Sequence, residues 1–125
     1  MIVGTGIDIV EISRIEKSME KFGQKFLDKI LTKKEMEYCQ TMRNPTPTLA
    51  GRFAAKEAAV KALGTGIQNG VSWKDIEIEN NELGKPVLRF YDKAKEIADK
   101  LLAINYFISI SHSKENAVAF VILEK

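Results

Sequence analysis

The first ten residues alternate in a way that predicts a β-strand over residues 2–10. One face of this strand carries the apolar side chains of Val3, Ile7 and Ile9. The other face carries Gly4, Gly6 and Asp8. The two glycines leave open space beside Asp8, and glycine within a strand often marks the close approach of a ligand or of another backbone. This glycine face could also meet another subunit.

Apolar residues at helical spacing follow the strand. Ser13 and Glu16 have the S-x-x-E spacing of a capping box, in which each side chain hydrogen-bonds the backbone N–H of the other residue. The apolar face of this helical segment consists of Ile15, Met19, Phe22 and Phe26. Gly23 is expected to interrupt the segment.

Two further helices are predicted before residue 64. Thr32 and Glu35 form a second capping box, which opens a helix from about Lys33 to Met42. The two prolines of residues 44–47 predict a loop. Thr48 can then cap an alanine-rich helix that runs to Leu63 and stops at Gly64.

The second half of the chain is richer in β-patterns. Residues 75–79 alternate with period two, and a turn over residues 80–86 separates them from a short strand at residues 87–90. An amphipathic helix is predicted over residues 92–103. Residues 106–111 and 117–123 flank a turn and should pair as an antiparallel hairpin. The expected fold is α+β, an antiparallel sheet with helices packed on one face, in a single domain over residues 1–125.

Composition narrows the class of protein. The chain of 125 residues has 45% hydrophobic and 29% charged residues, as soluble globular proteins do. It shows neither a signal peptide nor a run of about 20 apolar residues, so we expect a cytoplasmic protein with no membrane partner. The net charge of +2 and the lack of aromatic residues clustered among the basic ones argue against nucleic acid as a partner. The single cysteine, Cys39, is interpreted as a packing residue.

Two acids carry the first candidate chemistry, Asp8 in the strand and Glu57 in the alanine-rich helix. If the fold brings them together, they form a site for a hard cation such as Mg²⁺, which usually takes one or two carboxylates and completes its shell with water and substrate phosphates. Neighbouring lysines would balance phosphate charge. The plainer alternatives are a solvated acid on an edge strand and an exposed helical pair between Glu57 and Lys61.

Other polar residues have two interpretations each. Arg52 could reach a phosphate or cap a carboxylate. His112, at a strand end among hydroxyls, is a structural residue or, beside a phosphate site, a ligand contact. Basic residues recur every four positions after Arg14, namely Lys17, Lys21, Lys25 and Lys29. They form either a solvated helix face or a docking surface for an acidic partner.

Several motifs together resemble a known family. Gly6-Ile-Asp8 followed by Phe53-Ala-Ala-Lys-Glu-Ala-Ala-Val-Lys61 is similar to the two-part signature of the 4′-phosphopantetheinyl transferases. The wider blocks resemble the short bacterial type of this superfamily. These blocks are Gly6-Ile-Asp-Ile-Val10, Ala50-Gly-Arg-Phe-Ala-Ala-Lys-Glu57, Gly64-Thr-Gly66 and Ser109-Ile-Ser-His-Ser113.

The resemblance implies a Mg²⁺-dependent enzyme with a 4′-phosphopantetheinyl transferase-like fold. Such an enzyme passes phosphopantetheine from coenzyme A to a serine hydroxyl of apo acyl carrier protein and releases 3′,5′-ADP, in the service of fatty acid biosynthesis and lipid metabolism. The resemblance also implies a homotrimer whose active sites lie at subunit interfaces, where a neighbouring chain completes the site of Asp8 and Glu57.

The family likeness assigns roles to individual residues. Asp8 and Glu57 would hold the metal, Lys61 would stabilise the leaving 3′,5′-ADP, and Glu57, directly or through a metal-bound water, would be the base. Contacts to coenzyme A would come from Arg52, Lys61, Gly64, the Gly84–Pro86 turn and His112. Docking of the acidic carrier protein would fall to Arg14 and the basic helix after it, including Lys21 and Lys25.

One loop departs from the family pattern. Family members often carry several basic residues before the alanine-rich helix, where the 3′-phosphate is held, but residues 42–47 contain only Arg43. The partner of the 3′-phosphate therefore stays open. A non-catalytic module that binds coenzyme A or a nucleotide through the same acids and lysines is the alternative function.

Overall fold

The computed structural model describes residues 1–67 and 70–125. In chain order its elements are β1 (Ile2–Glu11), α1 (Ile12–Phe22), α2 (Gln24–Ile30), α3 (Lys33–Gln40), α4 (Thr46–Leu63), the 3-10 helix η1 (Trp73–Asp75), β2 (Ile76–Asn80), β3 (Pro86–Phe90), α5 (Asp92–Lys100), β4 (Asn105–His112) and β5 (Asn116–Glu124). The predicted α+β class is the observed one.

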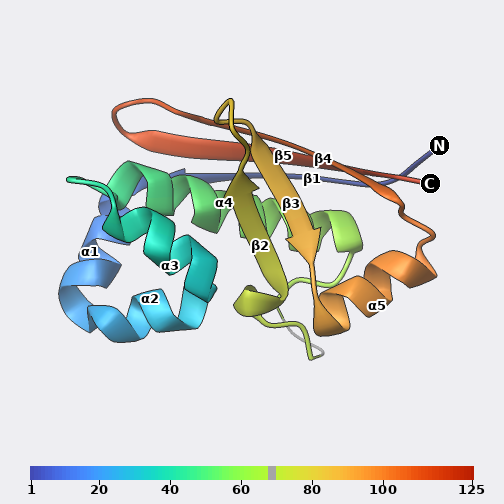
Figure 1. Ribbon diagram of the computed structural model, residues 1–125, viewed down its shortest axis with the longest axis horizontal. Helices are drawn as coiled ribbons and strands as arrows, with labels where there is room; N and C mark the ends of the chain where they lie inside the picture. Colours follow the sequence, from blue (N-terminus) through green and yellow to red (C-terminus); the bar gives the residue numbers. More distant parts are fainter. Residues whose placement is uncertain (68–69) are drawn as a thin grey trace.

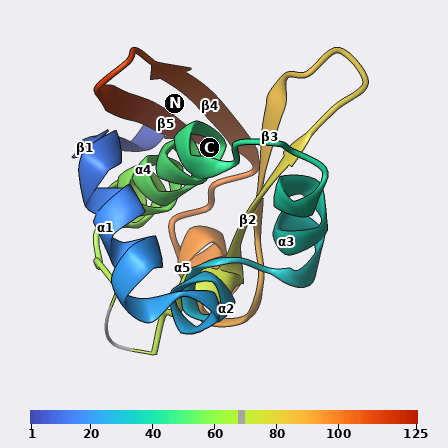
Figure 2. The ribbon, with the colours of Figure 1, turned by 90° about the vertical axis from the view of Figure 1, so that its left-hand side faces the viewer.

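The strands form two antiparallel sheets rather than one. The larger sheet has the order β1-β5-β4, and its β4–β5 pair is the hairpin predicted from the sequence. Strands β2 and β3 pair with each other and form a separate hairpin. Figures 1 and 2 show the helices on one side of the larger sheet, with α4 running along it and the β2–β3 hairpin beside β4.

The glycines of β1 allow α4 to approach the sheet closely. A Cβ atom added to Gly6 would lie 1.9 Å from the backbone oxygen of Ala58, and one added to Gly4 would lie 2.1 Å from that of Ala62. The expected open space beside Asp8 is therefore wrong, because the backbone of α4 fills it. Of the alternatives offered by the sequence, another backbone of the same chain explains these two glycines.

The apolar face of β1 points away from the core. Ile7 is 58% exposed and Ile9 is 65% exposed, and Phe107 and Phe120 of the neighbouring strands are exposed as well. Val3 does not share this face, because the register of β1 shifts between Ile2 and Gly4 and Val3 packs against the core. The outer side of the larger sheet thus presents apolar side chains to solvent.

The start of α3 follows the sequence prediction, whereas the start of α1 does not. Thr32 and Glu35 form the predicted capping box, although the helix ends at Gln40 and not at Met42. The box between Ser13 and Glu16 is absent, since α1 already begins at Ile12 without a side-chain cap. A hydrogen bond of 2.8 Å from the Ile12 N–H to the Glu115 carbonyl fixes this earlier start.

Three more details of the helices differ from the prediction. Thr48 is not a cap, because α4 begins at Thr46 and has Pro47 in its first turn, where proline is well tolerated. Phe22 is 53% exposed and lies outside the apolar face of α1. The last helix, α5, ends at Lys100, three residues before the predicted end.

Candidate functional site

Asp8 and Lys61 meet at the boundary between β1 and α4. The Lys61 ammonium donates to Asp8 Oδ1 at 3.1 Å and to the Ile7 carbonyl oxygen at 3.0 Å. The Asp8 side chain is 19% exposed and that of Lys61 is 53% exposed. The sequence paired Lys61 with Glu57 instead. Within the part of the chain that the structure covers, the ion pair of Lys61 is with Asp8 and none joins it to Glu57.

Glu57 lies close enough to this pair to respond to both charges. Burial raises the pKa of Glu57, the negative charge of Asp8 raises it further, and Lys61 opposes the shift. The two acids of the predicted metal pair therefore lie near one another, Asp8 on strand β1 and Glu57 on helix α4. Their mutual repulsion would be relieved by a cation placed between them.

The donor set suits a hard cation that keeps much of its hydration. No group of three or more His, Cys, Asp or Glu side chains suited to a metal occurs in residues 1–67 and 70–125. Two carboxylates, one desolvated and both near a lysine, match Mg²⁺, which is usually bound through one or two acids together with substrate phosphates. The residues present therefore fit this ion.

Gly64 belongs to the same side of α4 as Glu57 and Lys61. The three positions are spaced i, i+4 and i+7, which places them on one helix face. Gly64 is exposed and ends the helix with a left-handed backbone conformation, φ 84°. Asp8, Glu57, Lys61 and Gly64 thus form one half of the predicted site.

The remaining predicted contacts to coenzyme A line a different hollow. Arg52, Gly84, Pro86 and His112 all border one pocket of about 280 Å³. The pocket lies where the N-terminal part of α4, the β2–β3 turn and the end of β4 come together. Five residues separate Arg52 from Glu57, which is about 140° of rotation around a helix. The two halves of the predicted site therefore sit on opposite flanks of α4.

Arg52 is nearly buried and is held on several sides. Its Nη2 donates to Asn80 Oδ1 at 2.8 Å, its guanidinium lies 4.7 Å from the centre of the Tyr38 ring, and its Nε is 3.8 Å from Glu35 Oε2. The sequence offered a phosphate or a carboxylate as its partner. The structure supplies the carboxylate and also leaves the side chain at the wall of the pocket.

Lys56 does not belong to the site, although it precedes Glu57. Its side chain is fully buried and donates to Glu35 Oε1 at 2.6 Å and to the Ile30 carbonyl at 2.6 Å. Burial lowers the pKa of Lys56, and the charge of Glu35 and its hydrogen bond oppose that shift. Lys56 is a structural cation that ties α4 to α3.

Sequence reasoning missed Tyr38, Asn80 and Glu35. Tyr38 and Asn80 line the pocket together with Arg52. Glu35 was recognised only as part of a capping box, and its second role depends on residues 17 and 21 positions away. Little in the sequence could have revealed these contacts, because they join α3, α4 and β2.

The predicted docking residues are exposed on two short helices. Arg14 and Lys21 lie on α1 and Lys25 lies on α2, beyond the break at Gly23 that the sequence predicted. Arg43 is also exposed and does not line the pocket of Arg52. The basic residues therefore remain available at the surface, although on two helix segments and not on one.

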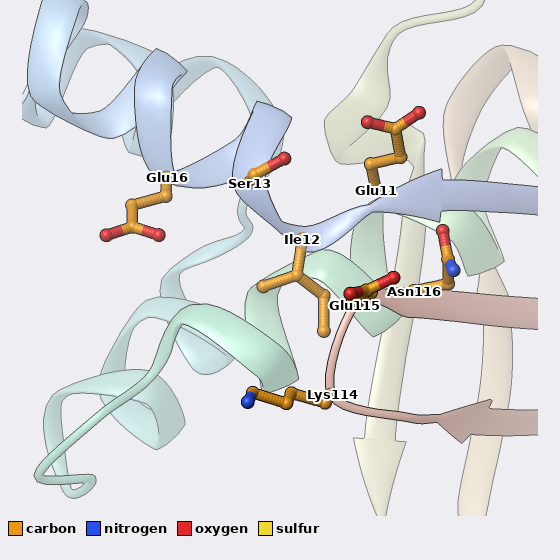
Figure 3. Close-up of a pocket in the computed structure, with 7 residues that line it drawn as sticks. All are labelled: Glu11, Ile12, Ser13, Glu16, Lys114, Glu115 and Asn116. Atoms are coloured by element: carbon orange, nitrogen blue, oxygen red, sulfur yellow. The ribbon is translucent and has the colours of Figure 1, made fainter.

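A separate pocket of about 560 Å³ lies beside α1, where β1 ends and the β4–β5 turn passes. Figure 3 shows that Ser13 and Glu16 point in different directions there. The lining residues are Glu11, Ile12, Ser13, Glu16, Lys114, Glu115 and Asn116. None of the site residues predicted from the sequence is among them.

Cys39 behaves as the packing residue that the sequence predicted. It is buried, and this burial is the main reason why the pKa of its thiol is raised. A thiol in such an environment is a poor nucleophile. As for membranes, none of the helices in the described ranges is long and apolar enough to cross a bilayer.

Comparisons with known proteins identify relatives of this chain. A family model described as the 4′-phosphopantetheinyl transferase superfamily matches residues 4–121. The holo-[acyl-carrier-protein] synthase of Koribacter versatilis is 48% identical over 124 residues, covering 99% of both chains.

Solved structures are similar over the whole chain. The crystal structure of the holo-[acyl-carrier-protein] synthase from Neisseria meningitidis superposes with a TM-score of 0.91 at 41% identity, covering 100% of both chains. The enzyme of that name from Bacillus anthracis, in complex with CoA (3′,5′-ADP), has a TM-score of 0.82 at 46% identity and covers 98% of this chain and 96% of its own.

Proposed function

The chain belongs to the 4′-phosphopantetheinyl transferase superfamily and is an enzyme of that class, and we propose that it transfers 4′-phosphopantetheine from coenzyme A to a serine hydroxyl of apo acyl carrier protein. The relatives are named for holo-acyl-carrier-protein synthesis, and one of them was solved with CoA (3′,5′-ADP). The second product would be 3′,5′-ADP. Such a reaction would serve fatty acid biosynthesis in the cytoplasm.

The convergence of Asp8, Glu57 and Lys61 is the observation that carries the proposal. Phosphoryl transfer depends on positioning and on the stabilisation of charge more than on covalent chemistry by the protein. Two carboxylates and a lysine in one small region are suited to that task. Asp8 and Glu57 would hold Mg²⁺, which when bound would neutralise charge on the pyrophosphate and polarise its oxygens.

The proposed step can be written with its bonds and protons in balance. The serine oxygen of the carrier protein forms a bond to the phosphorus that bears pantetheine, and the bond from this phosphorus to the oxygen of 3′,5′-ADP breaks. Glu57, directly or through a bound water, takes the serine proton. Lys61 stabilises the charge on the departing 3′,5′-ADP.

The pocket beside Arg52 would hold the rest of coenzyme A. Its wall combines a cation, a histidine and the turn residues Gly84 and Pro86. Because this pocket lies on the opposite flank of α4 from Glu57, one molecule of coenzyme A would meet both halves of the site only if a neighbouring chain supplied one of them. Lys61 and Gly64 would contact the nucleotide from the side of the metal pair.

The exposed face of the larger sheet supports a homotrimer. Ile7, Ile9, Phe107 and Phe120 form an apolar surface on the side of the sheet opposite α4. An apolar surface of this kind is typical of an interface. Association through it would bring the two halves of the site from different chains into reach of one another. The acidic carrier protein would dock on Arg14, Lys21 and Lys25, which mainly accelerate encounter and set specificity.

The mass of apo carrier protein after incubation with this protein and coenzyme A tests the proposal. We expect an increase by one phosphopantetheine group with Mg²⁺ and none after chelation. Asp8→Ala and Glu57→Ala should abolish the increase while circular dichroism shows folded protein, and Asp99→Ala, an exposed acid on α5, should leave it unchanged. Binding of coenzyme A without any mass increase would instead identify a non-catalytic binding module.

A further inference from the structure

The guanidinium of Arg52 carries a charge that its surroundings offset only in part. Its side chain is 5% exposed, and its Nε is a buried donor without a hydrogen-bond partner in residues 1–67 and 70–125. Glu35 is the carboxylate beside it, at 3.8 Å from Nε. Glu35 is already engaged, since its Oε1 accepts from Lys56 and its Oε2 accepts from the Ile78 N–H at 3.0 Å.

Glu35 therefore faces two buried cations, although the charge of Glu77 acts on Lys56 as well. Lys56 takes the short contact of 2.6 Å, which leaves Arg52 with the longer one. Glu79 lines the adjoining hollow of about 170 Å³, but it is itself paired with Lys34 and Arg89, each at 3.2 Å. The wall that Arg52 shares with the two hollows thus has a surplus of positive charge.

The remaining partners of Arg52 are neutral. Asn80 accepts from Arg52 Nη2 at 2.8 Å through its amide oxygen and donates to the Gly84 carbonyl at 3.0 Å through its amide nitrogen. It therefore links the guanidinium to the β2–β3 turn. The Tyr38 ring covers one face of the guanidinium at 4.7 Å. Both partners fix the position of Arg52 without consuming its charge.

We propose that Asn80 and Tyr38 are positioning residues that hold the Arg52 guanidinium, with its charge only partly offset by Glu35, for the 3′-phosphate of coenzyme A. The proposal rests on the function given above. In that function the pyrophosphate would be bound at Asp8 and Glu57 on the other flank of α4, so the phosphate that remains for Arg52 is the 3′-phosphate on the ribose. The loop before α4 has only Arg43 as a basic residue, and Arg43 lies outside the pocket.

Calorimetric titration with two nucleotides tests this assignment. The ligands are 3′,5′-ADP and 5′-AMP, which differ only in the 3′-phosphate. Asn80→Asp places a carboxylate against Arg52 and neutralises it. We expect the Kd of 3′,5′-ADP to rise about 10- to 100-fold, as for the loss of a charge-assisted hydrogen bond, while the Kd of 5′-AMP changes less than about twofold.

Further variants separate charge from position. Asn80→Ala removes the hydrogen bond but adds no charge, so it should raise the Kd of 3′,5′-ADP less than Asn80→Asp does. Tyr38→Leu removes the ring and should cost about two- to fivefold. Asn81→Asp adds the same charge in the same turn without contact to Arg52 and should keep the wild-type preference for 3′,5′-ADP. In turnover, the loss in Asn80→Asp should appear in the KM for coenzyme A and not in kcat.

Two outcomes would overturn the proposal. One is that both Kd values are unchanged in Asn80→Asp, and the other is an equal fold loss for both nucleotides, which would indicate a merely structural role. If the proposed function were wrong but this assignment right, the result would be different. The wild-type protein would then bind 3′,5′-ADP more tightly than 5′-AMP and yet leave the carrier protein unmodified.

Discussion

Lys61 reaches from α4 across to Asp8 in β1, and its ammonium lies 3.1 Å from Asp8 Oδ1 although 53 residues separate the two in sequence. The same nitrogen donates to the Ile7 carbonyl at 3.0 Å. This pair bridges the helix and the strand that carry the two proposed metal ligands. Because the side chain of Lys61 is half exposed, the pair is poorly placed to stabilise the fold.

Lys61→Gln should therefore separate activity from stability. We expect kcat for phosphopantetheine transfer to fall about 10²- to 10³-fold, since the charge on the departing 3′,5′-ADP loses its cation. The free energy of unfolding should change by less than about 1 kcal/mol. Steady-state kinetics and urea denaturation measure the two quantities. The matched variant Lys100→Gln, at an exposed position on α5, should leave both unchanged. Full turnover by Lys61→Gln would remove this lysine from the mechanism.

Gly6→Ala should damage the fold by pushing α4 off the sheet. The new Cβ would lie 1.9 Å from the Ala58 oxygen and 2.9 Å from the Ala62 nitrogen, both backbone atoms that cannot turn away. We expect a loss of about 3 kcal/mol or more in the free energy of unfolding, measured by urea denaturation. Gly64→Ala is the comparison, because that site is open and only its positive φ is unfavourable, so about 1 kcal/mol is expected. Equal losses in the two variants would contradict the close contact.

Local signals in the sequence predicted local structure well. The Thr32 capping box and the β4–β5 hairpin each depend on residues close together in the chain, and both are present. The Ser13 box had the same pattern but failed, because a hydrogen bond from Ile12 to the distant Glu115 carbonyl starts α1 earlier. A capping motif competes with tertiary hydrogen bonds that the sequence does not display.

The candidate site was predictable as a set of residues but not as an arrangement. The alternation of β1 placed Gly6 and Asp8 on one face, yet could not tell that α4 would cover that face. The helical spacing of Glu57 and Lys61 suggested a pair between them, whereas Asp8 takes the lysine. The pocket of Arg52 draws on α3, α4, the β2–β3 hairpin and β4, so no local pattern could reveal it.

Glu35 and Lys56 allow an asymmetric prediction about stability. Glu35→Gln removes the carboxylate that forms ion pairs with both buried cations, Lys56 and Arg52, and we expect it to cost about 3–5 kcal/mol in the free energy of unfolding. Lys56→Met should cost less, because Glu35 keeps Arg52 and its backbone donors. Urea denaturation of both variants measures the difference. A larger loss in Lys56→Met would show that the lysine, and not the carboxylate, organises this cluster.

Phe120→Asp tests whether the outer face of the larger sheet joins copies of the chain. Phe120 pairs across the strands with Ile7, and both side chains are exposed on this face. Because Phe120 points away from the core, the variant should fold, with an unchanged circular dichroism spectrum. In a trimer, however, an aspartate there would bury a charge in an apolar interface, which is strongly unfavourable.

Light scattering should therefore find three chains of 14.0 kDa in the wild-type particle and one in Phe120→Asp. The variant should also lose transfer activity, although Asp8, Glu57 and Lys61 are intact, because each protomer would then lack the half of the site that its neighbour supplies. Leu102→Asp makes the same change at an exposed apolar side chain after α5 and should keep both the assembly and the activity. A wild-type protein that is monomeric and fully active would contradict the shared site, because one chain presents Arg52 and Glu57 on opposite flanks of α4.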